Sequence, residues 1–297
     1  HLRFKDEGFK EKIMTKLVVI GKSGQLAWEI AHLVPEAVCL GREDIDITSS
    51  DAITAKLDEL KPDAVINASA YTAVDKAESD EQNAYLLNQT AVANLAQYCK
   101  SNKAFFVHVS TDYVFNGEKG SPYTVDDVIE PQGMYGKTKA AGEAEVKAIL
   151  PEASAILRTS WVYSSHGNNF VKTMLRLMAE KPQLGIIDDQ IGSPTWAKGL
   201  ARACVEAASQ RTAGIFHWSD EGVCSWYDFA IAIQQLGLEK GLLEQAVPIN
   251  PIPSSAYPTP ATRPHYSVLD KTLTRDTFNS PLNHWSEQLS AMMDELV

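Results

Sequence analysis

Cysteine, basic side chains and long apolar runs are all scarce in this sequence. Its four cysteines are widely separated, with no C-x-x-C pair and no histidine spaced to complete a zinc site. Only 27 basic residues stand against 38 acidic ones, which gives a formal charge of −11, and no basic run offers a track for a phosphate backbone. No stretch approaches the roughly 18 to 20 apolar residues that span a bilayer. We therefore expect reduced thiols, a cytoplasmic location, and neither nucleic acid nor a membrane as a partner.

The sequence does contain enough apolar material for a folded core. Apolar residues make up 44% of its 297 residues, which is sufficient for one or two domains. Residues 1–13 carry many charges, and Met14 directly precedes the first strand-like run. We expect residues 1–13 to be a leader outside the native fold.

Strand-like and helix-like segments alternate along the first half of the chain. Short β-branched or aromatic runs occupy residues 16–21, 37–40, 64–69 and 105–110, with a further run, taken as the sixth strand, at 153–159. Segments with helical apolar spacing lie between them, at residues 24–34, 50–60, 86–99 and 134–149. This alternation predicts an α/β fold, a Rossmann-type doubly wound parallel sheet with helices on both faces, over residues 14–160.

The second half is more mixed. It has helix-like segments at 169–179 and 197–208, one run that could be a strand at 214–218, and a proline-rich stretch at 248–264. We expect residues 161–297 to form mainly a smaller mixed α/β substrate lobe, interleaved with the first domain and closing over the carboxyl edge of its sheet.

The first predicted strand ends in a glycine-rich turn that leads into a helix. The pattern G-x-x-G-x-x-A contains Gly21, Ser23, Gly24, Gln25 and Leu26. Glycine permits tight turning, and a helix N-terminus presents unpaired N–H groups to a pyrophosphate. Such a pattern alone is equally consistent with an ordinary turn. Because it follows an apolar run and precedes an amphipathic helix, it favours dinucleotide binding.

Cofactor choice is expected near the end of the second strand. An acidic side chain there would bind the ribose hydroxyls, and a basic one would bind a 2′-phosphate. Arg42 follows this strand directly, and Asp46 and Ile47 follow shortly after. We predict that Arg42 binds the 2′-phosphate of NADPH, with NADH as the alternative, and that Asp46 and Ile47 approach the adenine. The competing interpretation is that Arg42 is a solvated surface charge.

A Tyr–Lys pair and a Ser-Thr dipeptide carry the predicted chemistry. Tyr135 and Lys139 stand four residues apart and share one face of a predicted helix, and Thr111 ends a predicted strand. A free tyrosine has a pKa of about 10, so a nearby cation is needed to favour its phenolate. Lys139 would supply that cation and bind the nicotinamide ribose, while Thr111 would position a carbonyl oxygen beside Tyr135.

The chain resembles the dTDP-4-dehydrorhamnose reductase family of the extended short-chain dehydrogenase/reductase superfamily. The resemblance rests on motifs in the same order, at residues 21–25, 67–78, 110–115, 135–139, 158–163, 189–195 and 258–264. It implies a dinucleotide-binding domain for NADPH or NADH, a lobe that binds a dTDP-sugar, and hydride transfer to the C4 ketone of that sugar.

The resemblance also implies roles for individual residues. Tyr135 is the expected proton donor, Lys139 its partner and Thr111 the residue that tunes it. The remaining expectations are a pyrophosphate site at Gly24, Gln25 and Leu26, the middle of the cofactor at Ala68, Ser69 and Ala70, the substrate at Thr111, Asp112, Tyr135 and Trp161, and further polar contacts at Asn67, Asn88 and Arg263.

Some family members hold an interfacial magnesium ion with acidic residues. Glu29 matches one such position, but Lys198 replaces the glutamate expected after the Pro-Thr-x-Ala segment. We therefore expect no metal site in this chain. The resemblance leaves a homodimer open, but Lys198 argues against one that a metal ion holds together.

Two competing functions remain. A nucleotide-sugar dehydratase or epimerase needs an acid and a base beside the ketone, and the dehydratases read Thr-Asp-Glu where this chain reads Thr-Asp-Tyr, ending in Tyr113. The family also resembles a non-catalytic regulatory subunit of methionine adenosyltransferase, which could bind NADP without turnover. The missing glutamate favours reduction over the first alternative, and the intact Thr111, Tyr135 and Lys139 favour a reductase over the second.

Overall fold

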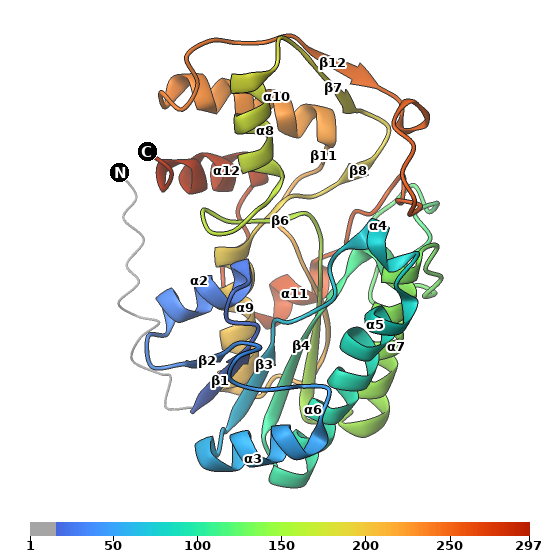
Figure 1. The fold of residues 1–297 in the computed structure, drawn as a ribbon, viewed down its shortest axis with the longest axis vertical. Coiled ribbons are helices and arrows are strands. Elements are labelled where there is room, and N and C mark those ends of the chain that lie inside the picture. The colour runs from blue at the N-terminus through green and yellow to red at the C-terminus, as the bar shows by residue number, and fades with distance from the viewer. Residues whose placement is uncertain (1–15) are drawn as a thin grey trace.

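The computed structural model describes residues 16–297, so the predicted leader and Met14 lie outside the described residues. Its main sheet has six strands: β1 (Leu17–Ile20), β2 (Val38–Leu40), β3 (Ala64–Asn67), β4 (Phe105–Thr111), β5 (Ser154–Thr159) and β10 (Gly214–Trp218). Their order is β10-β5-β4-β3-β1-β2, and every pairing is parallel (Figure 1). The predicted α/β Rossmann-type sheet is therefore confirmed. Strand β2 is added on one side of β1 and β3 on the other, so the strand order reverses between β1 and β3. Such folds bind their ligands at this switch point.

One strand assignment was wrong. The run at 153–159, expected as the sixth strand, is the fifth, and the sixth is β10 from the second half of the chain, which pairs with β5. Hydrophobic pattern identifies a strand, but its place in a sheet depends on long-range pairing. The predicted helix at 86–99 also differs, since it begins as a π-helical turn, η1 (Leu86–Thr90), and continues as α6 (Ala91–Asn102).

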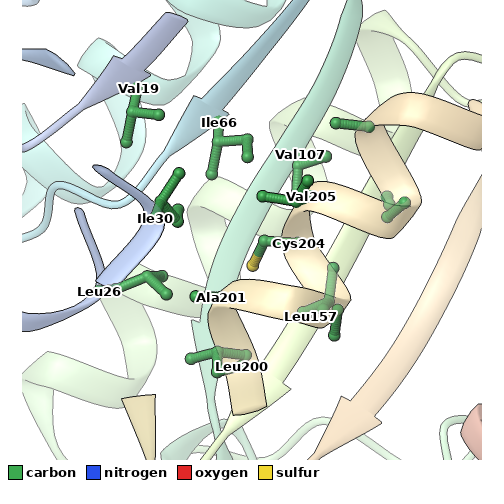
Figure 2. Packing of buried hydrophobic residues seen from close by; sticks show 14 of the residues in the cluster. Val19, Leu26, Ile30, Ile66, Val107, Leu157, Leu200, Ala201, Cys204 and Val205 are labelled. Carbon is green, nitrogen blue, oxygen red and sulfur yellow. The ribbon is translucent and has the colours of Figure 1, made fainter. Parts of the chain in front are cut away.

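Helices cover both faces of the sheet because successive strand residues point to opposite sides. Val19, Ile66, Val107 and Leu157 pack against α2 (Gln25–Leu33) and α9 (Ala197–Gln210) (Figure 2). On the other side, the sheet buries Val18, Val65, Phe106 and Ile156 against α3 (Ser50–Leu60), α6 and α7 (Met134–Ile149). Both strand faces are thus buried, as in other doubly wound sheets.

A second lobe with its own apolar cluster lies at the opposite end of the molecule from α3 (Figure 1). Its helices are α8 (Phe170–Glu180), α10 (Trp226–Glu239) and α12 (Trp285–Asp294), and its strand pairs are β6 (Val162–Tyr163) with β9 (Thr195–Trp196), β7 (Leu184–Ile187) with β12 (Ile249–Ile252), and β8 (Ile191–Gly192) with β11 (Cys224–Ser225). The remaining short elements of the described chain, in either half, are α4 (Val74–Ala77), α5 (Glu81–Tyr85), η2 (Asp112–Val114), η3 (Ser254–Ala256) and α11 (Thr272–Thr277). Within residues 16–297, no helix combines the length and apolarity needed to cross a bilayer.

Candidate active site

The glycine turn after β1 has the geometry of a phosphate-binding loop. Gly21 has a φ of +107°, and a Cβ there would come within 2.9 Å of the Ser69 backbone nitrogen, so only glycine fits. Gly24 is the N-cap of α2 and makes no side-chain cap hydrogen bond. The first N–H groups of this helix therefore lack a side-chain acceptor from the cap, which suits a bound phosphate.

A cavity of about 500 Å³ extends from this turn past the carboxyl ends of β3, β4 and β5 into the second lobe. It brings together most of the predicted site residues, namely Ser23, Gly24, Gln25, Leu26, Ala68, Ser69, Ala70, Thr111, Asp112, Tyr135, Lys139 and Trp161. Gly21 is outside the cavity lining, and its backbone packs against that of Ala68 and Ser69. The position of the cavity, between the glycine turn and the second lobe, suits a place where a cofactor and a substrate meet.

The residues predicted to select the cofactor lie outside the lining of this cavity. Arg42 is exposed beyond the end of β2, and its acidic neighbours Glu43 and Asp44 both pair with Lys22, at 3.4 and 3.7 Å. Asp46 accepts hydrogen bonds from the backbone N–H and hydroxyl of Thr48 instead of facing the cavity. Ile47 is buried in the apolar cluster beneath α3. Their roles toward the cofactor stay predictions.

The helix that carries Tyr135 and Lys139, α7, packs closely against η2, which directly follows β4. A Cβ at Gly136 would come within 2.2 Å of the Tyr113 carbonyl oxygen, so glycine allows this approach. Gly133, the N-cap of α7, offers no side-chain acceptor, and Glu78 Oε1 instead accepts the Met134 N–H at 2.7 Å. Tertiary contacts therefore cap the helix and fix the position of Tyr135.

Burial dominates the electrostatics of the Tyr–Lys pair. It raises the pKa of Tyr135 to about 12, while the nearby Thr111 hydroxyl lowers that pKa and the charge of Asp112 raises it. It lowers the pKa of Lys139 to about 8, against the charge of Glu143, which raises it. We expected Lys139 to favour the phenolate, but burial is the largest effect on the pKa of Tyr135, and the Lys139 ammonium donates to the Val109 carbonyl at 2.6 Å. Tyr135 is therefore a neutral phenol at pH 7, the form that can donate a proton.

Asp112 provides a buried carboxyl group beside this pair. Burial raises its pKa to about 6, although the Thr111 hydroxyl, which donates to Oδ1 at 3.0 Å, lowers it. Its Oδ2 atom has no hydrogen-bond partner among the described residues. A buried polar atom without a partner at a cavity wall is well placed to bind a ligand hydroxyl.

Three polar residues expected near the ligands instead support the site from outside the cavity lining. Asn67 accepts hydrogen bonds from the Ser69 backbone N–H and hydroxyl, which fixes the loop after β3. Asn88, fully buried in η1, bonds the Tyr71 backbone and the Thr138 hydroxyl. Arg263 makes a bidentate pair with Asp75, with both N–O distances 2.9 Å.

The reasoning from sequence missed Trp226. This residue lines the cavity and stacks on Trp161. No local signal links two tryptophans so far apart in the chain. The pairing of β8 with β11 brings the start of α10 beside Gly192, which lies against the Trp161 ring.

The residues around Glu29 do not fit a magnesium ion. They border a second cavity, of about 550 Å³, on the far side of α2. The Lys198 ammonium lies 3.1 Å from Glu295 Oε1, where a further oxygen ligand would be needed. Glu29 Oε1 already accepts hydrogen bonds from Ser164 and Trp196. Across residues 16–297, no cluster of three or more His, Cys, Asp or Glu side chains could hold a metal ion.

A doubly wound parallel sheet with a glycine turn, and with Thr, Tyr and Lys side chains meeting at its carboxyl edge, defines the class of short-chain dehydrogenases and reductases. The family described as RmlD substrate binding domain matches residues 14–297. The dTDP-4-dehydrorhamnose reductase of Aggregatibacter actinomycetemcomitans is 39% identical, over 93% of this chain and 97% of that protein. The chain therefore belongs to the dTDP-4-dehydrorhamnose reductase family, which confirms the resemblance seen in the sequence.

Solved structures agree with this assignment. A dTDP-4-dehydrorhamnose reductase from Clostridium acetobutylicum superposes with a TM-score of 0.89 at 40% identity, covering 95% of this chain and 99% of that one. The enzyme of the same name from Bacillus anthracis, in complex with NADP, also gives a TM-score of 0.89, at 32% identity and the same coverage. The relatives thus share both the fold and nearly the whole length of the chain.

Proposed function

We propose that this protein reduces the C4 ketone of dTDP-4-dehydro-L-rhamnose to give dTDP-L-rhamnose, with NADPH as the preferred hydride donor. The observation that carries the proposal is that Thr111, Tyr135 and Lys139 line the same cavity as the glycine turn. Burial there raises the pKa of Tyr135 to about 12, which keeps its phenol protonated. The family relatives are named for this reaction.

The cofactor would be held by the glycine turn and the loop after β3. Gly24, Gln25 and Leu26 would bind its pyrophosphate at the N-terminus of α2, and Ala68, Ser69 and Ala70 would line its middle. When bound, it supplies the hydride. Arg42 would meet a 2′-phosphate, because Lys22 already neutralises the two carboxylates beside it.

Side chains of this protein would stabilise and then neutralise the negative charge that forms on the ketone oxygen. Thr111 positions this oxygen beside Tyr135, and Tyr135 donates its proton to it as negative charge develops. Lys139 binds the ribose and stabilises the resulting phenolate by its charge. The Asp112 carboxyl and Trp161 hold the sugar, the first through a hydroxyl group and the second through its indole.

This arrangement favours reduction over dehydration or epimerisation. The position that carries a glutamate in dehydratases is Tyr113, whose ring lies edge-on to Tyr135 at 5.5 Å. Burial and the charge of Asp112 raise the pKa of Tyr113, so it stays protonated near neutral pH and cannot replace the glutamate as a base. A purely regulatory NADP-binding role is disfavoured because Thr111, Tyr135 and Lys139 all face the same cavity.

The four cysteines are free thiols, which suits a reducing cytoplasm. The partner we propose is a dTDP-sugar, without nucleic acid or membrane, and a homodimer would form without a metal bridge.

Replacing Tyr135 with Phe tests the proposed reaction. The variant keeps the ring but loses the hydroxyl, so turnover of NADPH with a 4-keto sugar nucleotide should fall on the order of a hundredfold or more. Affinity for NADPH should hardly change. Tyr98→Phe is the matched control, since its hydroxyl bonds Asp58 on α3, away from the cavity. A Tyr135→Phe variant that keeps most of its kcat would show that the proton comes from another group.

A further inference from the structure

Trp161 has a backbone conformation that bulky residues rarely adopt. Its φ is +47°. The other non-glycine residues with positive φ in the described chain, Lys61, Lys103 and Arg211, each end a helix, where a left-handed residue is common. Trp161 ends no helix, since it lies between β5 and β6 at the wall of the active-site cavity. Strain of this kind persists only where the surroundings enforce it, and it is often found at functional sites.

The indole of Trp161 is stacked on that of Trp226. Their ring centroids are 3.5 Å apart and their planes differ by 9°. Trp226 is the first residue of α10, and a capping box fixes this helix end, because the hydroxyl of Ser225 and the carboxylate of Asp228 each accept the other residue's backbone N–H at 3.0 Å. The stacking partner of Trp161 is therefore held in place by its own helix.

Gly192 leaves the room that the Trp161 indole occupies. Its φ is not positive, so its backbone does not require glycine. A Cβ at this position, however, would lie 2.6 Å from Cε2 and 2.8 Å from Nε1 of Trp161. Gly192 also pairs with Cys224 of β11, the strand that leads directly into Trp226. The close approach to Trp161 is thus what demands glycine at residue 192.

We propose that Gly192 is a positioning residue that keeps Trp161 stacked on Trp226, and that this stacked pair is the wall on which the apolar C–H face of the substrate's deoxysugar packs. The inference deepens the proposed function and rests on it. Thr111, Asp112 and Tyr135 supply the polar part of the same cavity, whereas the two indoles supply a rigid apolar surface. Trp226 is then a specificity-determining residue, and the strain at Trp161 is the cost of a preformed sugar site.

Gly192→Ala is the deciding variant, and Gly185→Ala is its matched control. A Cβ at Gly185, in β7 of the same lobe, would meet Ile252 at an ordinary contact distance of 3.4 Å. In Gly192→Ala, the KM for the sugar nucleotide should rise about tenfold, the loss expected when an aromatic contact is displaced. The KM for NADPH should stay unchanged, and Gly185→Ala should match the wild type in both constants.

Circular dichroism gives a readout that does not depend on activity. Two stacked indoles produce an exciton-coupled signal, which Trp161→Phe would assign and which Gly192→Ala should remove while the helical signal remains. In a Trp161→Phe background, the smaller ring leaves room for the Cβ of residue 192. The rise in the KM for the sugar nucleotide that Gly192→Ala causes should therefore be smaller in this background than in the wild type. Should Gly192→Ala fail to fold, Trp226→Leu must show the same selective rise in this KM.

The outcomes separate the two proposals. An unchanged KM for the sugar nucleotide in folded Gly192→Ala, or in Trp226→Leu, overturns the inference while leaving the reductase intact. A wild type that does not turn over the 4-keto sugar nucleotide overturns the proposed function. In that event, tryptophan quenching by the sugar nucleotide still decides the inference, because binding must weaken in Gly192→Ala and not in Gly185→Ala.

Discussion

The buried Arg158–Glu143 pair should show a large penalty when either partner is removed alone. Arg158 Nε and Nη2 donate to the two carboxylate oxygens of Glu143 at 2.9 and 2.7 Å, and the side chains are 1% and 0% exposed. Arg158→Met leaves the Glu143 carboxylate buried without its hydrogen-bonded counter-charge. The free energy of unfolding should therefore fall by about 3 to 5 kcal/mol.

Removing both charges together should restore stability. An apolar pair of similar volume avoids the cost of desolvating two ions, so Arg158→Met with Glu143→Leu should lie within about 1 kcal/mol of the wild type, or above it. The double-mutant cycle then gives a coupling on the order of 3 kcal/mol. Urea denaturation measures it, provided that the slope of the transition is the same in all four proteins.

The same double variant should shift the pH dependence of the active site. Glu143 lies one helical turn beyond Lys139, and its charge raises the pKa of that lysine against the effect of burial. Without Glu143, the pKa of Lys139 should fall below about 8, so the decline of kcat/KM for NADPH at alkaline pH should begin at a lower pH. The reasoning fails if the double variant is as unstable as Arg158→Met, or if the alkaline limb does not move.

Three further predictions concern the cofactor, the metal and the catalytic helix. Arg42→Ala should raise the KM for NADPH and leave that for NADH nearly unchanged in steady-state assays; equal effects on both would remove Arg42 from the cofactor site. Because Lys198 stands where a metal ligand would be needed, EDTA should change neither activity nor the oligomer size seen by light scattering. Loss of either, reversed by magnesium, would contradict this. Glu78→Ala should cost about 1 kcal/mol in thermal unfolding by exposing the N-terminus of α7, whereas Glu78→Gln, which keeps an acceptor for the Met134 N–H, should restore most of it. Equal losses in the two variants would rule out capping as the cause.

Several features of this protein follow from the sequence alone because they depend on neighbours in the chain. The alternation of apolar strands with amphipathic helices specifies the doubly wound class, since each period is set by local backbone geometry. The glycine turn and the four-residue spacing of Tyr135 and Lys139 are equally local. The motif order then indicates the family.

Tertiary structure decided what depends on distant pairings and on burial. It placed β10 at the edge of the main sheet, because hydrogen bonding between strands is not encoded in the pattern of either strand. It also stacked Trp226 on Trp161, two residues that are far apart in the chain. It further determined that the pKa of Tyr135 is raised, since the desolvation that raises it depends on the whole surrounding fold. Spacing can show which groups share a helix face, but only the packed chain determines which of them lose contact with water and therefore which form of each is stable.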